Sequence, residues 1–266
     1  MTIKSPILNV MTKAAYKAGN KLLKDFREIE NLQVSKKGIG DFVTSADLNS
    51  EETIIKELKK AHPGIEIVCE ENNPEFEEGK QEKRFIVDPL DGTLNFLHGL
   101  PHFSISIALM HKEEIVSGII YDPIKDELFW AEKGIGAFLN NSTRLRVSGR
   151  SDLKKSLVST GIPWRGMENT HKNFLKILQN AMQNCSGVRR FGSAALDLAY
   201  IAAGRYDAFW EFGLKIWDIA AGLLLVKEAG GFVEDIYNKD NVLYTGNILA
   251  CNNNLINEFK NNIILK

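Results

Sequence analysis

A proline-containing bend, DPLDGT at residues 88–93, has the residue types and the spacing to hold a metal ion. Pro89 fixes one backbone angle of this bend, so the side chains of Asp88 and Asp91 can converge on one point although they are three residues apart. The carbonyl oxygen of Leu90 can face the same point. The segment therefore offers several hard oxygen ligands of the kind that Mg²⁺ takes.

The end of the same bend has features that suit an anion. Gly92 and Thr93 would open a short helix over residues 93–97, and the first N–H groups of a helix have no partner within it. Such groups suit a phosphate, so a cation site and an anion site would lie next to each other. The bend is equally compatible with a strand-ending turn followed by a capped helix, and other carboxylates must decide between the two interpretations.

Two further acidic segments could complete such a site. Glu70 and Glu71 follow a predicted strand at residues 65–69, from which a side chain can point over a sheet edge. Asp218 lies at the start of an apolar helix that is predicted after Trp217. Each has a simpler explanation, since the glutamates could belong to an acidic surface loop and the aspartate could be a helix N-cap. Considered together with the bend, the three segments favour a carboxylate cage.

A cage of carboxylates in one cleft needs cations. Two carboxylates at close range repel each other by roughly a few kcal/mol at an effective dielectric constant of about 20, and they would also repel a phosphate. Divalent cations remove both repulsions, and two of them about 3.5–4 Å apart can stabilise the attacking and the leaving oxygen of an in-line displacement. Hydrolysis of a phosphate monoester, which is very slow in water, suits this pattern and needs no protein nucleophile.

These segments together resemble the inositol monophosphatase family, and closely its bacterial SuhB-type branch. The resemblance extends over nearly the whole chain, and the spacing between DPLDGTLNF at 88–96 and WDIAAG at 217–222 is highly specific. The other matching segments are KKGIGDFVTSAD at 36–47, the paired glutamates at 70–71 and GSAALDLAYIAAGRYDAFWE at 192–211.

Two positions depart from the family pattern. Cys69 stands where members often carry a small Gly or Ser before the paired glutamates, and a thiol is small enough that we expect little effect. The loop at residues 161–165 differs from that of animal inositol phosphatases, so the resemblance does not carry substrate contacts over to Trp164 and Arg165.

The resemblance implies which residues hold Mg²⁺. A first ion would be held by Glu70, Asp88 and the Leu90 carbonyl. A second ion would be held by Asp88, Asp91 and Asp218. Glu70 would also reach a weaker third ion. Asp88 would therefore bridge the first two ions.

The resemblance also implies catalytic roles. Thr93 and Asp47 would form a pair that positions and deprotonates the attacking water, and Glu70 would act with them. Lys36 would lie near enough to help balance charge. The hydroxyls of the substrate would contact Asp91 and Glu211. The full set of implied substrate-binding residues is Asp91, Gly92, Thr93, Ala194, Glu211 and Asp218.

As to function, the resemblance implies a Mg²⁺-dependent, lithium-sensitive phosphatase that acts as a homodimer on inositol-1-phosphate. Sister families share the core motifs, which leaves fructose-1,6-bisphosphate, an adenosine bisphosphate, NADP and histidinol phosphate as alternative substrates. Some SuhB-type relatives act as regulators through contacts with RNA polymerase and antitermination factors. That second hypothesis is compatible with intact catalytic motifs.

Composition excludes several other classes of protein. The 266 residues include 33 Lys and Arg against 34 Asp and Glu, so the net charge of −1 creates no basic field for nucleic acid or an anionic membrane. The three cysteines lie far apart and form no CxxC pair, which argues against a disulfide framework or a zinc knuckle. We find no signal peptide and no apolar run long enough for a membrane span, so we expect a cytoplasmic protein without direct membrane binding.

Two other motif interpretations fail. The DGT triplet resembles the end of the haloacid dehalogenase motif DxDGT, but Pro89 occupies the position of the nucleophile and cannot attack phosphorus. His98 and His102 have the spacing of zinc ligands on a helix, but Gly99 and Pro101 would break that helix.

The elements that must position these residues alternate between helix and strand, which predicts a mixed α/β fold. In the first half, helices are predicted from Pro6 to Leu22 and from a cap at 44–47 to His62, with a buried strand at 84–88. A hairpin is predicted for the strands at 103–110 and 115–121, joined at 112–114. In the second half, strands are predicted at 157–159, 187–190, 206–211 and 231–233, with helices at 170–183, at 194–203 and after Trp217.

The resemblance specifies this fold class further as a layered αβαβα sandwich of the inositol monophosphatase and fructose-1,6-bisphosphatase type. We expect a single domain over residues 1–266. Its first half, 1–150, would hold the metal-binding motifs, and its second half, 151–266, would hold the substrate pocket and Asp218. The active site would lie between the halves.

Overall fold

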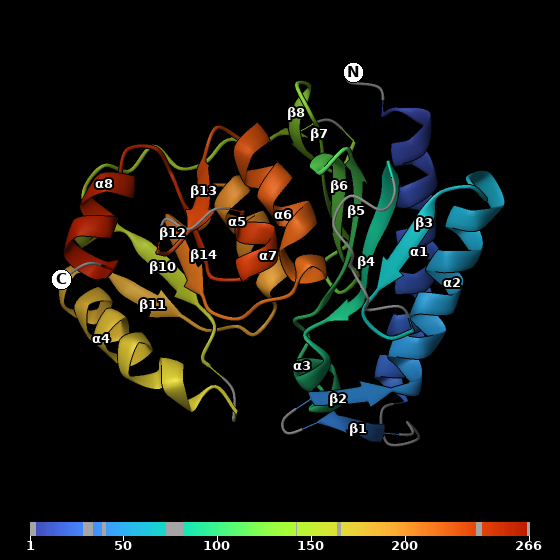
Figure 1. The fold of residues 1–266 in the computed structure, drawn as a ribbon, viewed down its shortest axis with the longest axis horizontal. Coiled ribbons are helices and arrows are strands. Elements are labelled where there is room, and N and C mark those ends of the chain that lie inside the picture. Colours follow the sequence, from blue (N-terminus) through green and yellow to red (C-terminus); the bar gives the residue numbers. More distant parts are fainter. Residues whose placement is uncertain are drawn as a thin grey trace.

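Helices and sheets alternate in five layers, α, β, α, β and α, in the computed structural model of the chain (Figure 1). From right to left in that view lie α1 and α2, a seven-stranded sheet, α5 and α6, a five-stranded sheet, and the pair α4 and α8. The structure describes residues 4–28, 34–38, 41–72, 82–141, 143–163, 166–237 and 241–264, and of residues 34–38 and 41–43 it describes the backbone alone. The layered α/β fold class predicted above is confirmed.

The seven-stranded sheet has the strand order β3-β4-β5-β6-β7-β8-β9. Its strands are β3 (Glu66–Cys69), β4 (Lys83–Asp91), β5 (Ser104–His111), β6 (Glu114–Asp122), β7 (Glu127–Glu132), β8 (Gly136–Leu139) and β9 (Thr143–Arg144). Neighbouring strands are antiparallel except β3 and β4, which run parallel. Because β3 and β4 are parallel, Glu70 and Asp88 emerge from the same end of the sheet.

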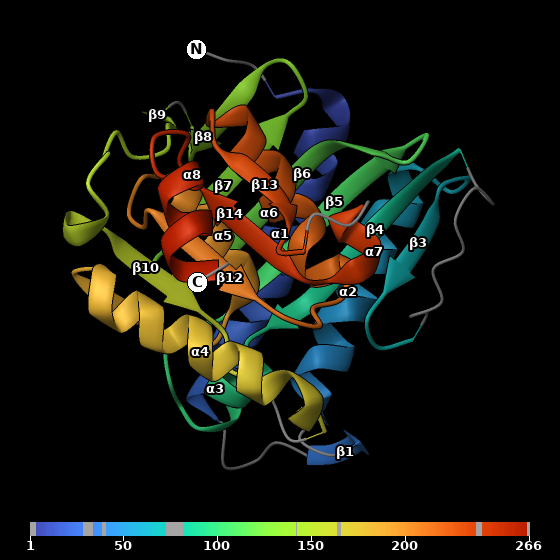
Figure 2. The same ribbon diagram turned by 60° about the vertical axis from the view of Figure 1, so that its left-hand side comes forward.

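The five-stranded sheet has the strand order β11-β10-β12-β14-β13. Its strands are β10 (Leu157–Thr160), β11 (Gly187–Arg189), β12 (Ala208–Glu211), β13 (Phe232–Asp235) and β14 (Ile248–Cys251). Strand β10 is parallel to both of its neighbours, whereas β14 is antiparallel to β12 and β13. In Figure 2 the outer helices α4 (Glu168–Asn184) and α8 (Ile256–Phe259) lie in front of this sheet.

The two long helices of the first layer begin at caps that the sequence predicts. Helix α1 (Pro6–Arg27) starts after Ser5, whose hydroxyl accepts a hydrogen bond from the Leu8 N–H at 3.4 Å, and its apolar stripe is buried against the sheet. Helix α2 (Ser45–Ala61) starts with a capping box between Thr44 and Asp47. The cap is also what brings Asp47 to the site.

The central layer packs against both sheets. Helices α5 (Ala194–Ala202) and α6 (Ile216–Glu228) contribute half of the buried residues of a large apolar cluster that includes residues of both sheets. Small residues allow the close approach: a Cβ on Gly118 of β6 would lie 3.0 Å from the Cα of Ala221, and one on Gly222 would lie 2.5 Å from Leu198. Segments at the start of α5 and α6 are thereby held against the end of β4.

Strand β4 continues further than predicted. The sequence suggests an end at Asp88, but β4 extends to Asp91, with an irregularity in its pairing to β5. Asp88 lies opposite Ser106 and Asp91 lies opposite Ser104, so three residue steps on β4 match two on β5. This is a β-bulge with one extra residue.

The bulge decides the direction of the two carboxylates. In a regular strand, residues three apart point to opposite faces of the sheet. Ser104 and Ser106 are two apart and share a face, and the extra residue in β4 lets Asp88 and Asp91 share it as well. That face is turned toward the central helices, because the Ser106 hydroxyl donates to the Trp217 carbonyl of α6 at 3.2 Å.

Other predicted elements agree with the structure or differ at their ends. The hairpin between β5 and β6 is confirmed, and both residues of its turn, Lys112 and Glu113, have positive φ. The segment before α2, for which no strand is predicted, contains a small hairpin of β1 (Val34–Gly38) and β2 (Asp41–Thr44). The sequence did not suggest this hairpin, β9, α7 (Val242–Thr245), β14, α8, a 3₁₀ turn η2 (Leu153–Lys155) or a final turn η3 (Lys260–Ile264).

Among the described helices, none combines the length and the apolar character that crossing a membrane requires.

Candidate active site

The bend at the end of β4 is fixed by bonds on both of its flanks. One carboxylate oxygen of Asp88 accepts a hydrogen bond from the Leu90 N–H at 3.0 Å. The Pro89 carbonyl accepts one from the Ser50 hydroxyl of α2 at 2.8 Å. Asp88 is 1% exposed and Asp91 is 9% exposed, so both carboxylates lie in a largely water-free place at the end of the strand.

A threonine and an aspartate form a pair beside the bend. Thr93 opens the short helix α3 (Thr93–Leu97), as predicted, and its hydroxyl lies 3.0 Å from Oδ1 of Asp47 and 3.0 Å from the Leu90 carbonyl. The other oxygen of Asp47 accepts from the Thr44 N–H at 2.9 Å and from the Thr44 hydroxyl. Because Asp47 is buried, its pKa is raised from the ordinary value.

Gly92 is the hinge between the bend and α3. It adopts φ +97°, which favours glycine, and it occupies the N-cap position of the helix. A Cβ here would lie 3.2 Å from the carbonyl oxygens of both His102 and Gly192. Asn95 holds these two segments near Gly92, because its side-chain amide donates to the carbonyl of His102 at 2.8 Å and to that of Phe191, the residue before Gly192, at 2.7 Å.

Glu70 directly follows β3 and lies beside the end of β4. Its N–H donates to the Val87 carbonyl at 3.3 Å, and the pairing of Cys69 with Val87 places it level with Asp88 on the neighbouring strand. The charge of Glu70 contributes to raising the pKa of Asp88. Residues 73–81, the middle of the acidic surface loop that offered the simpler explanation, lie outside the described residues.

Asp218 approaches the same place from the central layer. It is the third residue of α6 and not its N-cap, because the helix begins at Ile216, and its carboxylate accepts from the Lys215 N–H at 2.7 Å. Burial and the charge of Asp91 raise the pKa of Asp218 to about 8. Asp218 therefore caps the start of α6 and also lies beside the other carboxylates.

Asp91 is held by the start of α5, a contact that the sequence did not suggest. Its Oδ2 accepts from the Ser193 hydroxyl, from the Ala195 N–H at 2.9 Å and from the Ser104 hydroxyl at 3.4 Å. A further bond comes from the N–H of Ala194. Burial raises the pKa of Asp91 and these donors lower it, so they favour the ionised form.

Glu211 lies at the end of β12, directly over Gly161. A Cβ on Gly161 would come within 1.8 Å of the Glu211 carboxylate, so only glycine leaves room for this side chain. Burial, with repulsion from Asp197 and Asp91, raises the pKa of Glu211 to about 8. Asp197 of α5 is itself buried and its pKa is raised for the same reasons, and sequence reasoning had not singled it out.

The carboxylates influence one another strongly. The pKa of Asp88 is raised well above its ordinary value by burial and then by the charges of Glu70, Asp91 and Asp218. A divalent cation would remove that repulsion and favour the ionised forms, so the donor set suits Mg²⁺. In the described part of the chain, no three His, Cys, Asp or Glu side chains are already grouped as the ligands of one ion.

The remaining predicted residues are placed in part. The backbone of Lys36 lies in β1, but its side chain is outside the description. Trp164 and Arg165 fall in the undescribed part of the loop before α4. His98 follows α3 in an exposed turn and His102 packs beside Phe191 with ring centroids 5.1 Å apart, so the two histidines do not share a helix.

Comparison with known proteins adds a family and several relatives. The model of the inositol monophosphatase family matches residues 3–264. An inositol-1-monophosphatase of Mesorhizobium japonicum is 54% identical over 249 residues, which are 94% of this chain and 92% of that protein. The Nus factor SuhB of Pseudomonas aeruginosa is 44% identical over 251 residues, 93% of this chain and 92% of that one. The structure of the extragenic suppressor protein SuhB from Bartonella henselae has a TM-score of 0.92 at 49% identity and covers 97% of this chain and 98% of its own.

Proposed function

Since the chain belongs to the inositol monophosphatase family, we propose that it hydrolyses inositol-1-phosphate to inositol and phosphate in a reaction that requires Mg²⁺. The observation that carries this proposal is the bulge in β4, which turns Asp88 and Asp91 to one face beside the Thr93–Asp47 pair. The names of the relatives support a phosphatase, and the chemistry of the carboxylates supports the metal.

In this proposal Mg²⁺ is held by Glu70, Asp88, the Leu90 carbonyl, Asp91 and Asp218. When bound, the ion supplies positive charge that neutralises the phosphate and favours the leaving oxygen. The protein keeps Asp88 and Asp91 oriented through the Leu90 N–H and through Ser193. These bonds hold one oxygen of each carboxylate and so fix the direction of the other.

Thr93 and Asp47 handle the proton of the attacking water. The Thr93 hydroxyl has one proton and two acceptors at 3.0 Å, Asp47 and the Leu90 carbonyl. If it donates to Asp47, its lone pairs face outward and can accept from a water. Burial raises the pKa of Asp47 above its ordinary value, which makes its carboxylate a stronger base for the proton.

The substrate would bind between the two sides of the site. The N–H groups of Gly92 and Thr93 at the start of α3 would bind the phosphate. The substrate hydroxyls would contact Asp91, Glu211 and the backbone at Ala194. Lys36 would add positive charge, and Glu70 would assist the water. We also propose a cytoplasmic homodimer.

The test is phosphate release from a panel of inositol, sugar and nucleotide phosphates, with Mg²⁺ varied and Li⁺ added. We expect the fastest release from inositol-1-phosphate, only with Mg²⁺, and inhibition by Li⁺. Faster release from fructose-1,6-bisphosphate, an adenosine bisphosphate, NADP or histidinol phosphate would keep the chemistry and change the substrate. No release from any ester at any Mg²⁺ concentration would contradict the proposal.

A second candidate function is favoured by the relatives named Nus factor SuhB. In that case the chain would act by contacting RNA polymerase and antitermination factors. The Asp88→Asn variant distinguishes the two functions, because it alters the site and leaves the outer surface unchanged. Co-purification with RNA polymerase and rescue of a deletion strain by this variant would support the regulatory role, and failure of both would remove it.

A further inference from the structure

One face of α2 contacts three segments of the site, which are α3, the bend at the end of β4 and the turn after β3. We call these segments, with α2, the α2 side or first side of the site. Asp47, Ser50 and Glu51 are related by helical steps of three and four residues, so they share a face. Asp47 accepts from Thr93 of α3, and Ser50 donates to the Pro89 carbonyl in the bend. Glu51 accepts from the turn that follows β3.

Glu51 is a fully buried carboxylate whose two oxygens both accept hydrogen bonds. Its Oε2 accepts from the Glu71 N–H at 2.9 Å. Its Oε1 accepts from the Asn72 N–H at 3.1 Å and from the side-chain amide of Asn72 at 2.5 Å. The exposed fraction of Glu51 is 0%.

This arrangement requires a carboxylate. Burying an ionised group is costly unless hydrogen bonds replace its water, and here three N–H donors do so. A glutamine would place an NH₂ group where one oxygen now accepts, and that group would face an N–H donor. The turn would then lose one of its two attachments to α2.

We propose that Glu51 is a positioning residue, which ties the turn at residues 70–72 to α2 and so sets the place of Glu70 relative to Asp88. Because Glu51 lies one helical turn from Asp47, the same helix sets the distance between Glu70 and Thr93. Glu51 is not among the proposed metal or substrate ligands and acts through the Glu71 and Asn72 N–H groups. That Glu70 and Asp88 hold Mg²⁺ rests on the proposed function.

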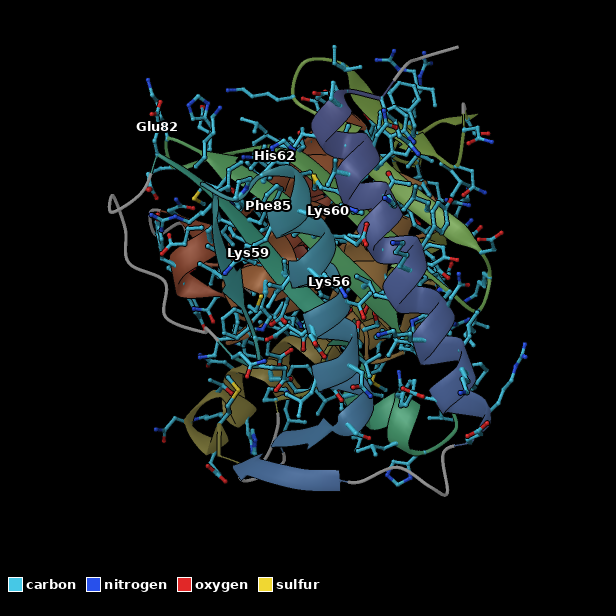
Figure 3. All side chains as sticks on the ribbon, turned by 90° about the vertical axis from the view of Figure 1, so that its right-hand side faces the viewer. Lys56, Lys59, Lys60, His62, Glu82 and Phe85 are labelled. Carbon is cyan, nitrogen blue, oxygen red and sulfur yellow. The ribbon has the colours of Figure 1, made fainter. Side chains whose placement is uncertain are left out.

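A matched control lies next to it in the chain. Glu52 has the same side chain on the same helix and is exposed. Figure 3 shows that α1 and α2 cover the outer face of the sheet, with Lys56, Lys59 and Lys60 labelled on the last turns of α2. Glu52 is exposed, as these lysines are, so the removal of its charge takes place in solvent.

The experiment compares Glu51→Gln with Glu52→Gln in the full-length protein. Mg²⁺ binding is measured by calorimetry without substrate, and exchange of the Glu71 and Asn72 amide hydrogens is measured by NMR or mass spectrometry. For Glu51→Gln we expect Mg²⁺ affinity to fall by about 10–100-fold, the usual effect of losing a group that orients a ligand. We expect the two amides to exchange faster in this variant, and Glu52→Gln to match the wild type in both measurements.

Wild-type affinity and wild-type amide protection in a folded Glu51→Gln variant would overturn the proposal. If that variant does not fold, Asn72→Asp decides, since this exposed side chain would place a negative charge against Glu51 and loosen the same turn. Unchanged Mg²⁺ affinity in a folded Asn72→Asp protein would then overturn it. Wild-type protein that binds Mg²⁺ but releases no phosphate would refute the proposed function and leave this inference standing.

Discussion

The two sides of the site differ in how far along the chain their contacts reach. On the α2 side, Glu51 contacts Glu71 across 20 residues and Thr93 contacts Asp47 across 46. On the α5 and α6 side, Asp91 accepts from Ser193 across 102 residues, and Ser106 donates to Trp217 across 111.

The difference also separates two kinds of role. The α2 side holds the Thr93–Asp47 pair that would prepare the water, and it lies beside Glu70 and Asp88. The α5 and α6 side supplies hydroxyl and N–H donors that orient Asp91, and it also carries Asp218, a further proposed Mg²⁺ ligand. We therefore expect substitutions on the first side to lower kcat and substitutions on the second side to raise KM. Four predictions test this division, from the largest expected effect to the smallest.

Asp88→Asn should have the largest effect. The substitution keeps the shape of the side chain and removes the charge that would bridge two ions, so we expect kcat to fall by about 10²–10³-fold, as when a main electrostatic contact is lost. Mg²⁺ affinity should fall with it. The measurement is phosphate release over a Mg²⁺ titration. Unchanged Mg²⁺-dependent release would show that the metal assignment is wrong.

Thr93→Ala should have the next largest effect. It removes the hydroxyl between Asp47 and the water, and we expect kcat to fall by about 10²-fold with little change in KM. Thr93→Ser is the matched control, because it keeps the hydroxyl, and it should retain most of the activity. Equal losses in the two variants would mean that the methyl group matters and the hydroxyl does not.

Ser193→Ala should affect the second side. It removes a hydrogen bond to a buried carboxylate, so we expect KM to rise by about tenfold while kcat changes by less. Ser104→Ala removes the longer contact to the same oxygen, 3.4 Å, and should raise KM less. A loss confined to kcat in Ser193→Ala would break the division between the two sides.

The pH dependence of stability should reveal Glu211 in protein without metal. The pKa of Glu211 is about 8 in the folded chain against an ordinary value of 4.5, so the folded state binds the proton more tightly than the unfolded state. Stability should therefore fall as pH rises from about 4.5 to about 8 and should level off above that window.

Glu211→Gln removes this titration and should make the fall in stability less steep, while Asp218, whose pKa is also about 8, continues to contribute to it. We expect the difference in Tm between pH 5 and pH 9 to shrink by about a few degrees relative to the wild type. The measurement is thermal unfolding in the presence of a chelator. Superimposable pH profiles for the two proteins would show that Glu211 titrates near its ordinary value.

The short-range side of the site is also the side that the sequence predicts best. The DPLDGT motif, the glutamate after β3 and the helix start at Thr93 could be recognised because each lies within one local segment. The bulge could not, because it depends on the register between β4 and β5. Asp218 lies near the helix start as predicted, and it caps α6 from the third helical position, since its carboxylate accepts from the N–H of the N-cap residue Lys215.

The sequence contains no recognisable signal for the donors that reach Asp91 from distant parts of the chain. Ser193 reads as an ordinary helix cap, and it is one, since its hydroxyl also accepts from the Leu196 N–H. Glu51 reads as one more acid on an amphipathic helix, and only the fold shows that it is buried. The catalytic and metal roles assigned to the site residues stay predictions until the variants above are measured.

The bulge in β4 means that this site depends on chain length as well as on residue identity. Deleting Pro89 alone would leave every carboxylate in the sequence and would place the two aspartates two residues apart on one face of a regular strand. It would remove the bend between them, with the Pro89 carbonyl that accepts from Ser50 and the geometry in which the Leu90 N–H orients Asp88. A survey of single-residue deletions should therefore find a sharp minimum in tolerance at residues 89–90. Ordinary substitution scans would miss this requirement, since they never change the spacing.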